Sequence, residues 1–303
     1  MAVYVVGDFL RETRLRKGYT QEEVSYGICT PASLSRIENG AQKPGRLILE
    51  KLFERLGTEN NLFNSFVSRE EMELYSAIQE LIRNITDDAV SKIETQIEVV
   101  EKLAVNTSEL EHQCLYFAKG ELARQKEKDD EKAMEMYMKA IHITLPDFDG
   151  KNPLRNNLLT FDEIMIINSI AILYGNSENV ITAIQLDMWL IEYMENKIVD
   201  GKMKTTKYPM IMYNLSCWLE DKGCYREELR MAEQGIDFCV KYGNLALFPK
   251  LVLNKGGALV KMGDNENARK YLHQAITIFD AMGKLEIVQQ VTAWCKDNCE
   301  FEI

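Results

Sequence analysis

A helix-turn-helix unit that recurs along the chain constrains the possible folds more than any other feature. Its clearest copy spans residues 253–276, in which small residues such as Gly256 and Ala268 return at fixed offsets among apolar ones. A second copy spans residues 213–236 and carries Glu228 where the first has Ala268. Looser copies occupy residues 119–141 and 168–191. Small residues at fixed offsets let two helices pack closely, so the repeat predicts stacked helix pairs.

These offsets are those of tetratricopeptide (TPR) repeats. Residues 70–103 are predicted to form another, degenerate pair, and residues 285–296 a closing helix. Proline interrupts helices, so four prolines are expected near the gaps between helical stretches: Pro146, Pro153, Pro209 and Pro249. The pattern calls for no strands. We therefore predict an all-α protein in which about five TPR-like pairs form a right-handed α-superhelix over residues 67–303.

Residues 1–66 differ in charge from this acidic body. They carry 9 Lys and Arg against 8 Asp and Glu, whereas the remainder carries 27 against 39, and the whole chain has a net charge of −11. Several of the basic residues cluster between positions 11 and 17. The asymmetry favours contact with nucleic acid by the N-terminal part alone. We therefore predict two domains, residues 1–66 and residues 67–303.

Helix signals divide the N-terminal domain into about five helices. Thr20 followed by Glu23 is a capping box, in which each side chain bonds the backbone amide at the other position. Thr30 and Pro31 supply a hydroxyl cap and a proline at the first helical position. Two further apolar-striped helices are expected, over residues 47–56 and about 59–66. Two short helices joined by a tight turn are typical of a helix-turn-helix, whose second helix enters the DNA major groove.

The stretches "TQEEV", "SLSRIENG" and "KP" resemble the Xre/Cro-type helix-turn-helix family over about residues 9–62. The turn before Thr30 is one residue shorter than in many members and is similar to the Rgg and PlcR branch. The resemblance implies contact with double-stranded DNA through five residues: Gln21, Thr30, Ala32, Ser33 and Arg36. Specific sites in this family come from paired units on half-sites about one helical turn apart, so a homodimer is also implied.

Each of these roles has a plainer alternative. Gln21 either contacts a phosphate or simply lies in the first turn of its helix, and Thr30 either caps its helix alone or also touches a phosphate. Arg36 matches a base-reading position, as do Ala32 and Ser33. Its guanidinium either clasps a guanine bidentately, or contacts a phosphate or solvent. Arg14 and Glu38 match the internal ion pair of the family, which is structural.

Three asparagines are candidate ligand-binding residues of the TPR-like domain. Counted from the repeat glycines, Asn214 and Asn254 occupy the sixth repeat position and Asn168 the fifth or sixth, which faces the concave side of a superhelix. An asparagine side chain both donates and accepts hydrogen bonds, so such a row can hold the backbone of an extended peptide. The alternative is that these asparagines bond water or a neighbouring loop.

A helix-turn-helix followed by TPR-like pairs resembles the RRNPP-type (Rgg, PlcR and ComR) peptide-responsive regulators of Gram-positive bacteria. The resemblance implies a sequence-specific transcription regulator that is controlled by a short quorum-sensing peptide bound in the concave groove. Two alternatives stay open. One is a TPR adaptor that inhibits a protein partner, with DNA binding secondary, and the other is a regulator whose groove is filled by its own side chains.

Enzymatic classes find no support in the sequence. The histidines His112, His142 and His273 occur singly, and neither a phosphate-binding loop nor a nucleophile motif is present. The seven cysteines are scattered without a CxxC pair, which indicates reduced thiols. We therefore predict no catalytic residue, metal or cofactor. No apolar stretch is long enough to span a bilayer and no leader pattern is evident, so a cytoplasmic protein without membrane contact is expected.

Overall fold

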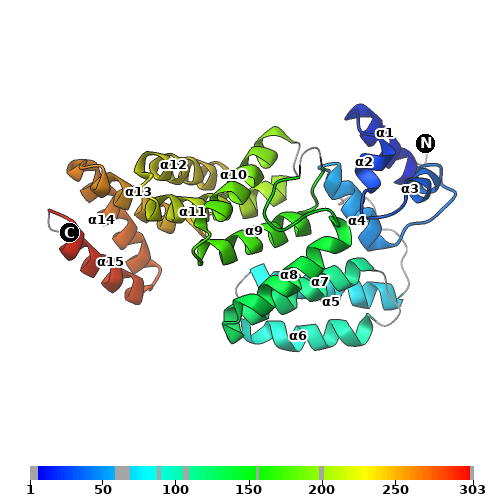
Figure 1. Cartoon of the computed structure of the whole chain (residues 1–303), viewed down its shortest axis with the longest axis horizontal. Coiled ribbons are helices and arrows are strands. Elements are labelled where there is room, and N and C mark those ends of the chain that lie inside the picture. The colour runs from blue at the N-terminus through cyan, green and yellow to red at the C-terminus, as the bar shows by residue number, and fades with distance from the viewer. Residues whose placement is uncertain are drawn as a thin grey trace. The chain divides into compact units, whose positions relative to one another are not determined.

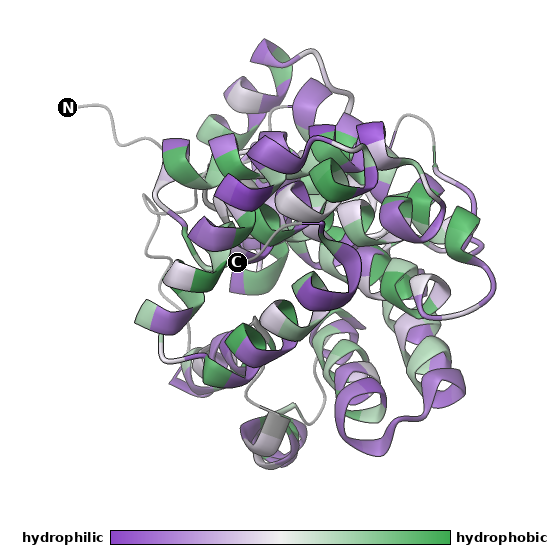
Figure 2. Cartoon of the chain, turned by 90° about the vertical axis from the view of Figure 1, so that its left-hand side faces the viewer, coloured by the Kyte–Doolittle hydropathy of each residue, from purple (hydrophilic) through white to green (hydrophobic). Residues whose placement is uncertain are grey.

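All regular elements of the computed structural model are helical within the residues it describes, which are 6–58, 69–86, 90–104, 109–154, 157–197 and 201–300 (Figure 1). The all-α prediction is confirmed. None of the described helices combines the length and the apolar character needed to cross a membrane. Hydrophilic and hydrophobic residues alternate along individual helices, as expected for amphipathic helices that bury one face (Figure 2).

The chain divides into two compact units. The first comprises Met1–Leu173 with Lys197–Asp200, and the second comprises Tyr174–Asn196 with Gly201–Ile303. The N-terminal helices thus belong to the same compact unit as the first TPR-like helices. The predicted domain boundary at residues 66 and 67 lies outside the described residues and stays a prediction.

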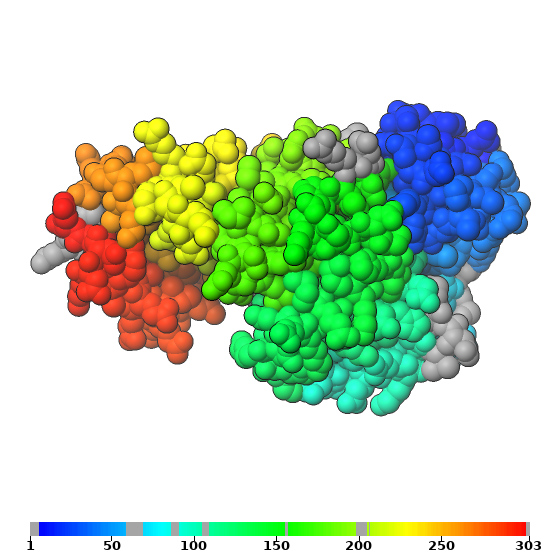
Figure 3. Space-filling view, in the orientation of Figure 1, coloured from blue at the N-terminus to red at the C-terminus, as the bar shows by residue number. Residues whose placement is uncertain are grey.

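Four helices form the N-terminal part of the first unit, which we call the head. They are α1 (Val6–Arg16), α2 (Gln21–Ser25), α3 (Pro31–Glu38) and α4 (Arg46–Arg55). Their apolar faces share one core that includes Leu10, Leu34, Leu52 and Phe53, each at most 1% exposed. The fifth predicted helix, at residues 59–66, lies outside the described residues. Leu158 joins the same core, so the head packs directly on the rest of its unit (Figure 3).

The rest of the first unit consists of helices in TPR-like pairs. They are α5 (Arg69–Thr86), α6 (Val90–Leu103), α7 (Glu109–Leu122), α8 (Asp130–Thr144) and α9 (Phe161–Gly175), with a π-helical turn, η1 (Ala123–Glu127), after α7. The predicted small positions pack as expected, since Ala133 and Ala140 are fully buried. A Cβ atom at Gly120 would lie only 2.4 Å from the ring of Tyr137, so the close approach of α7 and α8 requires a glycine there.

The second unit continues the pattern with six further helices. They are α10 (Val180–Asn196), α11 (Gly201–Asp221), α12 (Tyr225–Tyr242), α13 (Phe248–Lys261), α14 (Asn265–Ala281) and α15 (Leu285–Asn298). Ala268 and Ala275 are fully buried where α14 packs on α13. The pairing of α11 with α12 and of α13 with α14 agrees with the two clearest sequence repeats.

Pro209 does not lie near a gap, contrary to the sequence expectation. It sits inside α11, where its ring nitrogen cannot donate to the carbonyl of Thr205 four residues earlier. The side-chain amide of Asn244 donates to that carbonyl instead, at 3.0 Å. A proline is tolerated within a helix when another donor satisfies the carbonyl that it leaves unbonded, and Asn244 supplies that donor.

Candidate nucleic-acid interface and peptide-binding face

Helices α2 and α3 are positioned by local caps that the sequence predicted. The Thr20 hydroxyl accepts from the Glu23 amide at 3.1 Å and the Glu23 carboxylate accepts from the Thr20 amide at 2.7 Å, which confirms the capping box. The Thr30 hydroxyl accepts from the Ser33 amide at 3.1 Å and so caps α3. In the turn between them Gly27 has φ +68°, and a Cβ atom there would lie 2.0 Å from the Thr144 carbonyl oxygen.

Glu38 joins α1, α2 and α3 through one buried carboxylate. Arg14 donates to it twice, from Nε to Oε1 at 2.6 Å and from Nη2 to Oε2 at 2.9 Å, and this confirms the predicted internal ion pair. Gln21 donates from Nε2 to Oε2 at 2.7 Å. The side chain of Gln21 thus supports the helix-turn-helix from within, while its contact with a phosphate stays a prediction. Glu38 itself is 2% exposed.

Four of the predicted DNA-binding residues lie together on α3 and its cap. Thr30, Ala32 and Arg36 are exposed and Ser33 is half-buried. The Arg36 guanidinium donates from Nη2 to the Ser33 hydroxyl at 3.1 Å and from Nε to the Gln42 side-chain oxygen at 3.0 Å. The helix therefore presents a hydrogen-bonding surface to its surroundings, as a recognition helix must.

Two ion pairs join α4 of the head to the first turn of α9. Lys51 Nζ lies 2.8 Å from Asp162 Oδ2, and Arg55 Nη2 lies 2.7 Å from Glu163 Oε1, with both of the latter side chains fully buried. Glu163 also accepts from the Thr160 amide at 2.6 Å, within the cap of α9. Breaking a buried pair leaves an uncompensated charge, so these contacts define one orientation of the head on α9.

Glu54 adds a titratable group to this junction. Its carboxylate contacts Lys51 at 3.2 Å and accepts from the Phe161 amide at 3.0 Å. Burial raises the pKa of Glu54 to about 7, and the charge of Lys51 only partly offsets that effect. Burial tends to lower the pKa of Lys51, but the carboxylates of Asp162 and Glu54 outweigh it, so the lysine stays charged.

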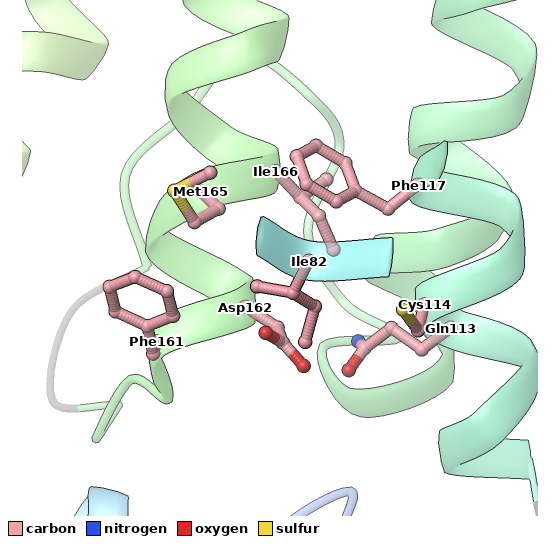
Figure 4. Close-up of a pocket in the computed structure, with 8 residues that line it drawn as sticks. All are labelled: Ile82, Gln113, Cys114, Phe117, Phe161, Asp162, Met165 and Ile166. Atoms are coloured by element: carbon pink, nitrogen blue, oxygen red, sulfur yellow. The ribbon is translucent and has the colours of Figure 1, made fainter. Parts of the chain in front are cut away.

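A small apolar pocket adjoins the junction within the first unit (Figure 4). Asp162, one of its lining residues, is also the partner of Lys51. Gln113, another, donates to the Thr144 hydroxyl at 2.7 Å, and the backbone of Thr144 meets Gly27 of the head. The pocket is lined by Ile82 of α5, by Gln113, Cys114 and Phe117 of α7, and by Phe161, Asp162, Met165 and Ile166 of α9.

The three predicted peptide-binding asparagines differ in environment. Asn168 lies on α9 in the first unit and is 1% exposed. Asn214 and Asn254 lie on α11 and α13 of the second unit and are half-buried. Asn254 donates to the Ser216 hydroxyl at 2.7 Å and to the Cys217 sulfur at 3.3 Å, whereas the amide nitrogen of Asn214 is buried without a partner among the described residues. Peptide contact by all three stays a prediction.

Helices α11 and α13 also bring charged and aromatic groups together. The Lys250 ammonium lies 5.3 Å from the ring centre of Tyr213. On the same side of α13, a Cβ atom at Gly257 would meet nothing within 4 Å, so this stretch is open beside Asn254. Neighbouring turns of α13 thus carry the Asn254 amide, the Lys250 ammonium and the space beside Gly257.

Glu228 is fully buried on α12, and neither of its carboxylate oxygens has a hydrogen-bond partner among the described residues. Burial and, to a smaller extent, the negative charge of Glu220 raise the pKa of Glu228 to about 8, and the positive charge of Lys261 only partly offsets them. The carboxyl group is therefore mostly protonated at neutral pH. It occupies the repeat position at which an alanine is usual.

Sequence reasoning missed the groups that join distant parts of the chain. Lys51 and Arg55 lie more than 100 residues from Asp162 and Glu163, and no periodicity marks either set as partners. Gln42 was missed because a glutamine in a polar turn carries no distinguishing signal. Glu228 was the one exception that the sequence did reveal, because it is an ionisable residue at a repeat position that usually holds a small one.

Comparisons with known proteins match both parts of the chain. A family model described as the RNPP family C-terminal domain matches residues 151–298, and one described as a helix-turn-helix domain matches residues 5–66. YqaF of Bacillus subtilis (strain 168), an uncharacterized HTH-type transcriptional regulator, is 38% identical over 63 residues. That match covers 20% of this chain and 83% of YqaF.

Two solved structures resemble nearly the whole chain in fold. Bacillus thuringiensis PlcR in complex with the peptide PapR7 and DNA has a TM-score of 0.62 at 19% identity, covering 95% of this chain and 98% of PlcR. The apo form of the competence regulator ComR from Streptococcus vestibularis has a TM-score of 0.53 at 14% identity, covering 97% and 98% of the two chains.

Proposed function

Because this chain belongs to the RRNPP-type helix-turn-helix transcription regulators, we propose that it binds operator DNA through α2 and α3 under the control of a short signalling peptide. The family consists of transcription regulators rather than enzymes. The observation that carries the proposal is the likeness of fold over 95% of the chain to PlcR, whose solved complex contains both a peptide and DNA. Binding of chromosomal DNA also implies a cytoplasmic protein.

Helix α3 supports the DNA-binding part of the proposal. It carries Ala32 and Arg36 exposed and Ser33 half-buried between them, and its N-terminus carries the exposed Thr30 hydroxyl. Gln21 at the start of α2 is half-buried and donates to Glu38, and we infer that it also contacts a phosphate. A single head contacts few phosphates, so we infer that two copies of the chain bind two half-sites about one helical turn apart as a homodimer.

The face formed by α11 and α13 supports the peptide-binding part. Asn214 has a buried amide nitrogen that lacks a partner among the described residues, and Asn254 keeps its carbonyl oxygen for an additional donor. An extended peptide offers alternating donors and acceptors that such amides can satisfy. Asn168 belongs to the first unit and is 1% exposed, so the proposal rests on Asn214 and Asn254.

Helix α9 contributes residues to both compact units. Its first turn holds α4 through Asp162 and Glu163, while its last residues, Tyr174 and Gly175, belong to the second unit. A Cβ atom at Gly175 would lie 2.2 Å from the indole of Trp218, so these two residues approach closely within the second unit. We infer that a peptide controls DNA binding by binding one conformation of the protein better than another.

DNA binding with and without peptide tests the proposal directly. We expect the purified chain to bind a labelled duplex from the region upstream of its own gene, with affinity that falls steeply as salt rises. Synthetic peptides derived from small neighbouring reading frames should change that affinity, and the double variant Asn214→Ala and Asn254→Ala should reduce the change. Unaltered peptide affinity in the double variant would remove the asparagine assignment.

The same measurement separates the alternatives. An adaptor that acts on a protein partner would bind duplexes weakly and without sequence preference. A regulator whose groove is filled by its own side chains would bind its operator with preference but ignore every peptide. Failure to bind any upstream duplex at modest ionic strength would overturn the proposed function itself.

A further inference from the structure

The exposed Arg36 side chain is held in place by two neighbours. Its Nε donates to Gln42 Oε1 at 3.0 Å and its Nη2 donates to Ser33 Oγ at 3.1 Å. Ser33 Oγ also accepts from the Thr30 hydroxyl at 3.0 Å, so the network reaches back to the cap of α3. A long arginine on a helix surface ordinarily samples many rotamers, whereas this one has a defined direction.

The backbone of Gln42 is hydrogen-bonded to the C-terminal end of α3. Its backbone amide donates to the Arg36 carbonyl at 3.2 Å, and the neighbouring Ala41 amide donates to the same carbonyl at 2.8 Å. Gly40, with φ +69°, makes the turn that brings the chain back to the end of α3. The Gln42 side chain therefore starts from a fixed backbone position, close enough for its oxygen to accept from Arg36.

The two bonds occupy one particular edge of the guanidinium. Nε and Nη2 lie on its lateral edge, and that edge is the one taken by Gln42 and Ser33. A guanidinium has five N–H groups, so three have no bond to the described residues: both on Nη1 and one on Nη2. Those at the far end of the group form a fork that matches the O6 and N7 acceptors of guanine.

We propose that Gln42 is a positioning residue that holds the lateral edge of Arg36 and so directs the end of its guanidinium toward a guanine in the major groove. The inference rests on the proposed DNA-binding function and adds a determinant of its specificity. Because the direction of Arg36 is set before DNA arrives, less side-chain freedom is lost on binding. Gln42 carries no charge, so its contribution concerns base preference more than attraction to phosphates.

Selection and affinity measurements on defined duplexes test the role of Gln42. The wild-type full-length chain selects its preferred sequence from a library of duplexes randomised over about 20 base pairs, enough for two half-sites. Fluorescence anisotropy then gives the affinity for the selected duplex and for versions in which each guanine is replaced in turn. The variants are Gln42→Ala, Arg36→Ala, their combination, and Gln185→Ala, an exposed glutamine on α10 that serves as matched control.

We expect Gln42→Ala to reduce discrimination at one guanine per half-site by about fivefold or more, within the range that a bidentate contact supplies. Affinity for an unselected duplex should stay unchanged. In the Arg36→Ala background Gln42→Ala should have no further effect on preference, because the group that it positions is gone. Gln185→Ala should leave every affinity as it is in wild type.

Two results overturn the inference and are distinguishable from each other. If the wild type selects a sequence but Gln42→Ala keeps the same discrimination, or weakens all duplexes equally, Gln42 does not position Arg36 although the protein reads DNA. If the wild type selects no sequence at all, the proposed function fails and the inference fails with it. Thermal unfolding of each variant ensures that the compared proteins are folded.

Discussion

The head and the second unit bury carboxylates in opposite ways. Glu38 accepts from Arg14 and Gln21, and Glu163 at the junction accepts from Arg55 and the Thr160 amide. Glu228 in the second unit is just as buried but has no partner among the described residues. Burying a charge is costly unless it is paired, so the first two carboxylates are held by complete sets of donors, whereas burial raises the pKa of Glu228 and favours its protonated form.

This difference matches the tasks that we propose for the two regions. A reading head must hold α3 in one geometry, and complete ion pairs between distant elements favour a single arrangement. A unit that responds to a ligand needs groups whose state can change, and an unpaired carboxyl with a pKa of about 8 is such a group. The following substitutions break or sharpen the contrast.

The largest effect is expected at the Arg55 and Glu163 pair. Arg55→Met or Glu163→Leu alone should lower the free energy of unfolding by about 3–5 kcal/mol, because each leaves an unpaired buried charge. Urea unfolding followed by circular dichroism measures the loss, and hydrogen exchange of α4 and α9 locates it. Arg69→Met at an exposed pair, with side chains 86% and 51% exposed, should change stability by at most about 0.5 kcal/mol.

The double variant Arg55→Met and Glu163→Leu tests whether the ion pair adds to the stability of the fold or only favours one arrangement of α4 on α9. Nε and Nη1 of Arg55 make no hydrogen bond to the described residues, so part of its burial cost is uncompensated. We therefore expect the double variant to be more stable than either single variant and close to wild type. A double variant as unstable as the worse single variant would contradict this account.

An intermediate effect is expected from Glu228→Gln, and it should depend on pH. Because burial raises the folded pKa of Glu228 above its unfolded value, its stabilising contribution is full below about pH 4.5 and is lost as pH rises through about 8. The uncharged glutamine avoids this loss. The variant should match wild type near pH 5 and exceed it by up to about 4 kcal/mol near pH 9, because about 3 pH units separate pH 5 from the folded pKa and each is worth about 1.4 kcal/mol.

Tryptophan fluorescence follows the unfolding of the second unit, which contains Glu228, because Trp189, Trp218 and Trp294 all belong to that unit. Glu54 in the first unit also titrates near neutrality, but it is present in both proteins and cancels in the difference. Glu266→Gln, at an exposed site on α14, serves as the control and should show no such dependence. Equal stability of Glu228→Gln and wild type across the range would mean that Glu228 finds a partner in solution.

Local sequence signals predicted much of the head but little of what attaches it. The caps at Thr20 and Thr30 depend on residues three positions apart, so a short stretch of sequence contains the whole interaction. The Arg55 and Glu163 pair depends on two helices meeting after the chain has folded, and neither residue is unusual in its own segment. Pro209 shows the same limit, because the donor that makes it acceptable, Asn244, lies 35 residues later in the loop after α12.

The smallest effect is expected from Gln21→Ala. This change leaves the buried Glu38 carboxylate with fewer hydrogen-bond donors, whereas Glu228 has none among the described residues. The substitution removes one of the hydrogen bonds to the Glu38 carboxylate but leaves both bonds from Arg14. The free energy of unfolding should fall by about 1 kcal/mol, the usual value for one hydrogen bond, because the Glu38 carboxylate keeps its other donors. Urea unfolding measures it against Gln185→Ala, which should be neutral.

Binding to DNA then separates the two roles of Gln21. If Gln21 also contacts a phosphate, Gln21→Ala should weaken all duplexes by a similar factor and leave base preference as it is, since phosphates carry no sequence information. A variant that loses stability but binds every duplex as tightly as wild type would assign Gln21 to the head alone. Glu38 would then be the reason for a glutamine at this position, because its buried carboxylate needs a donor from α2 as well as from α1.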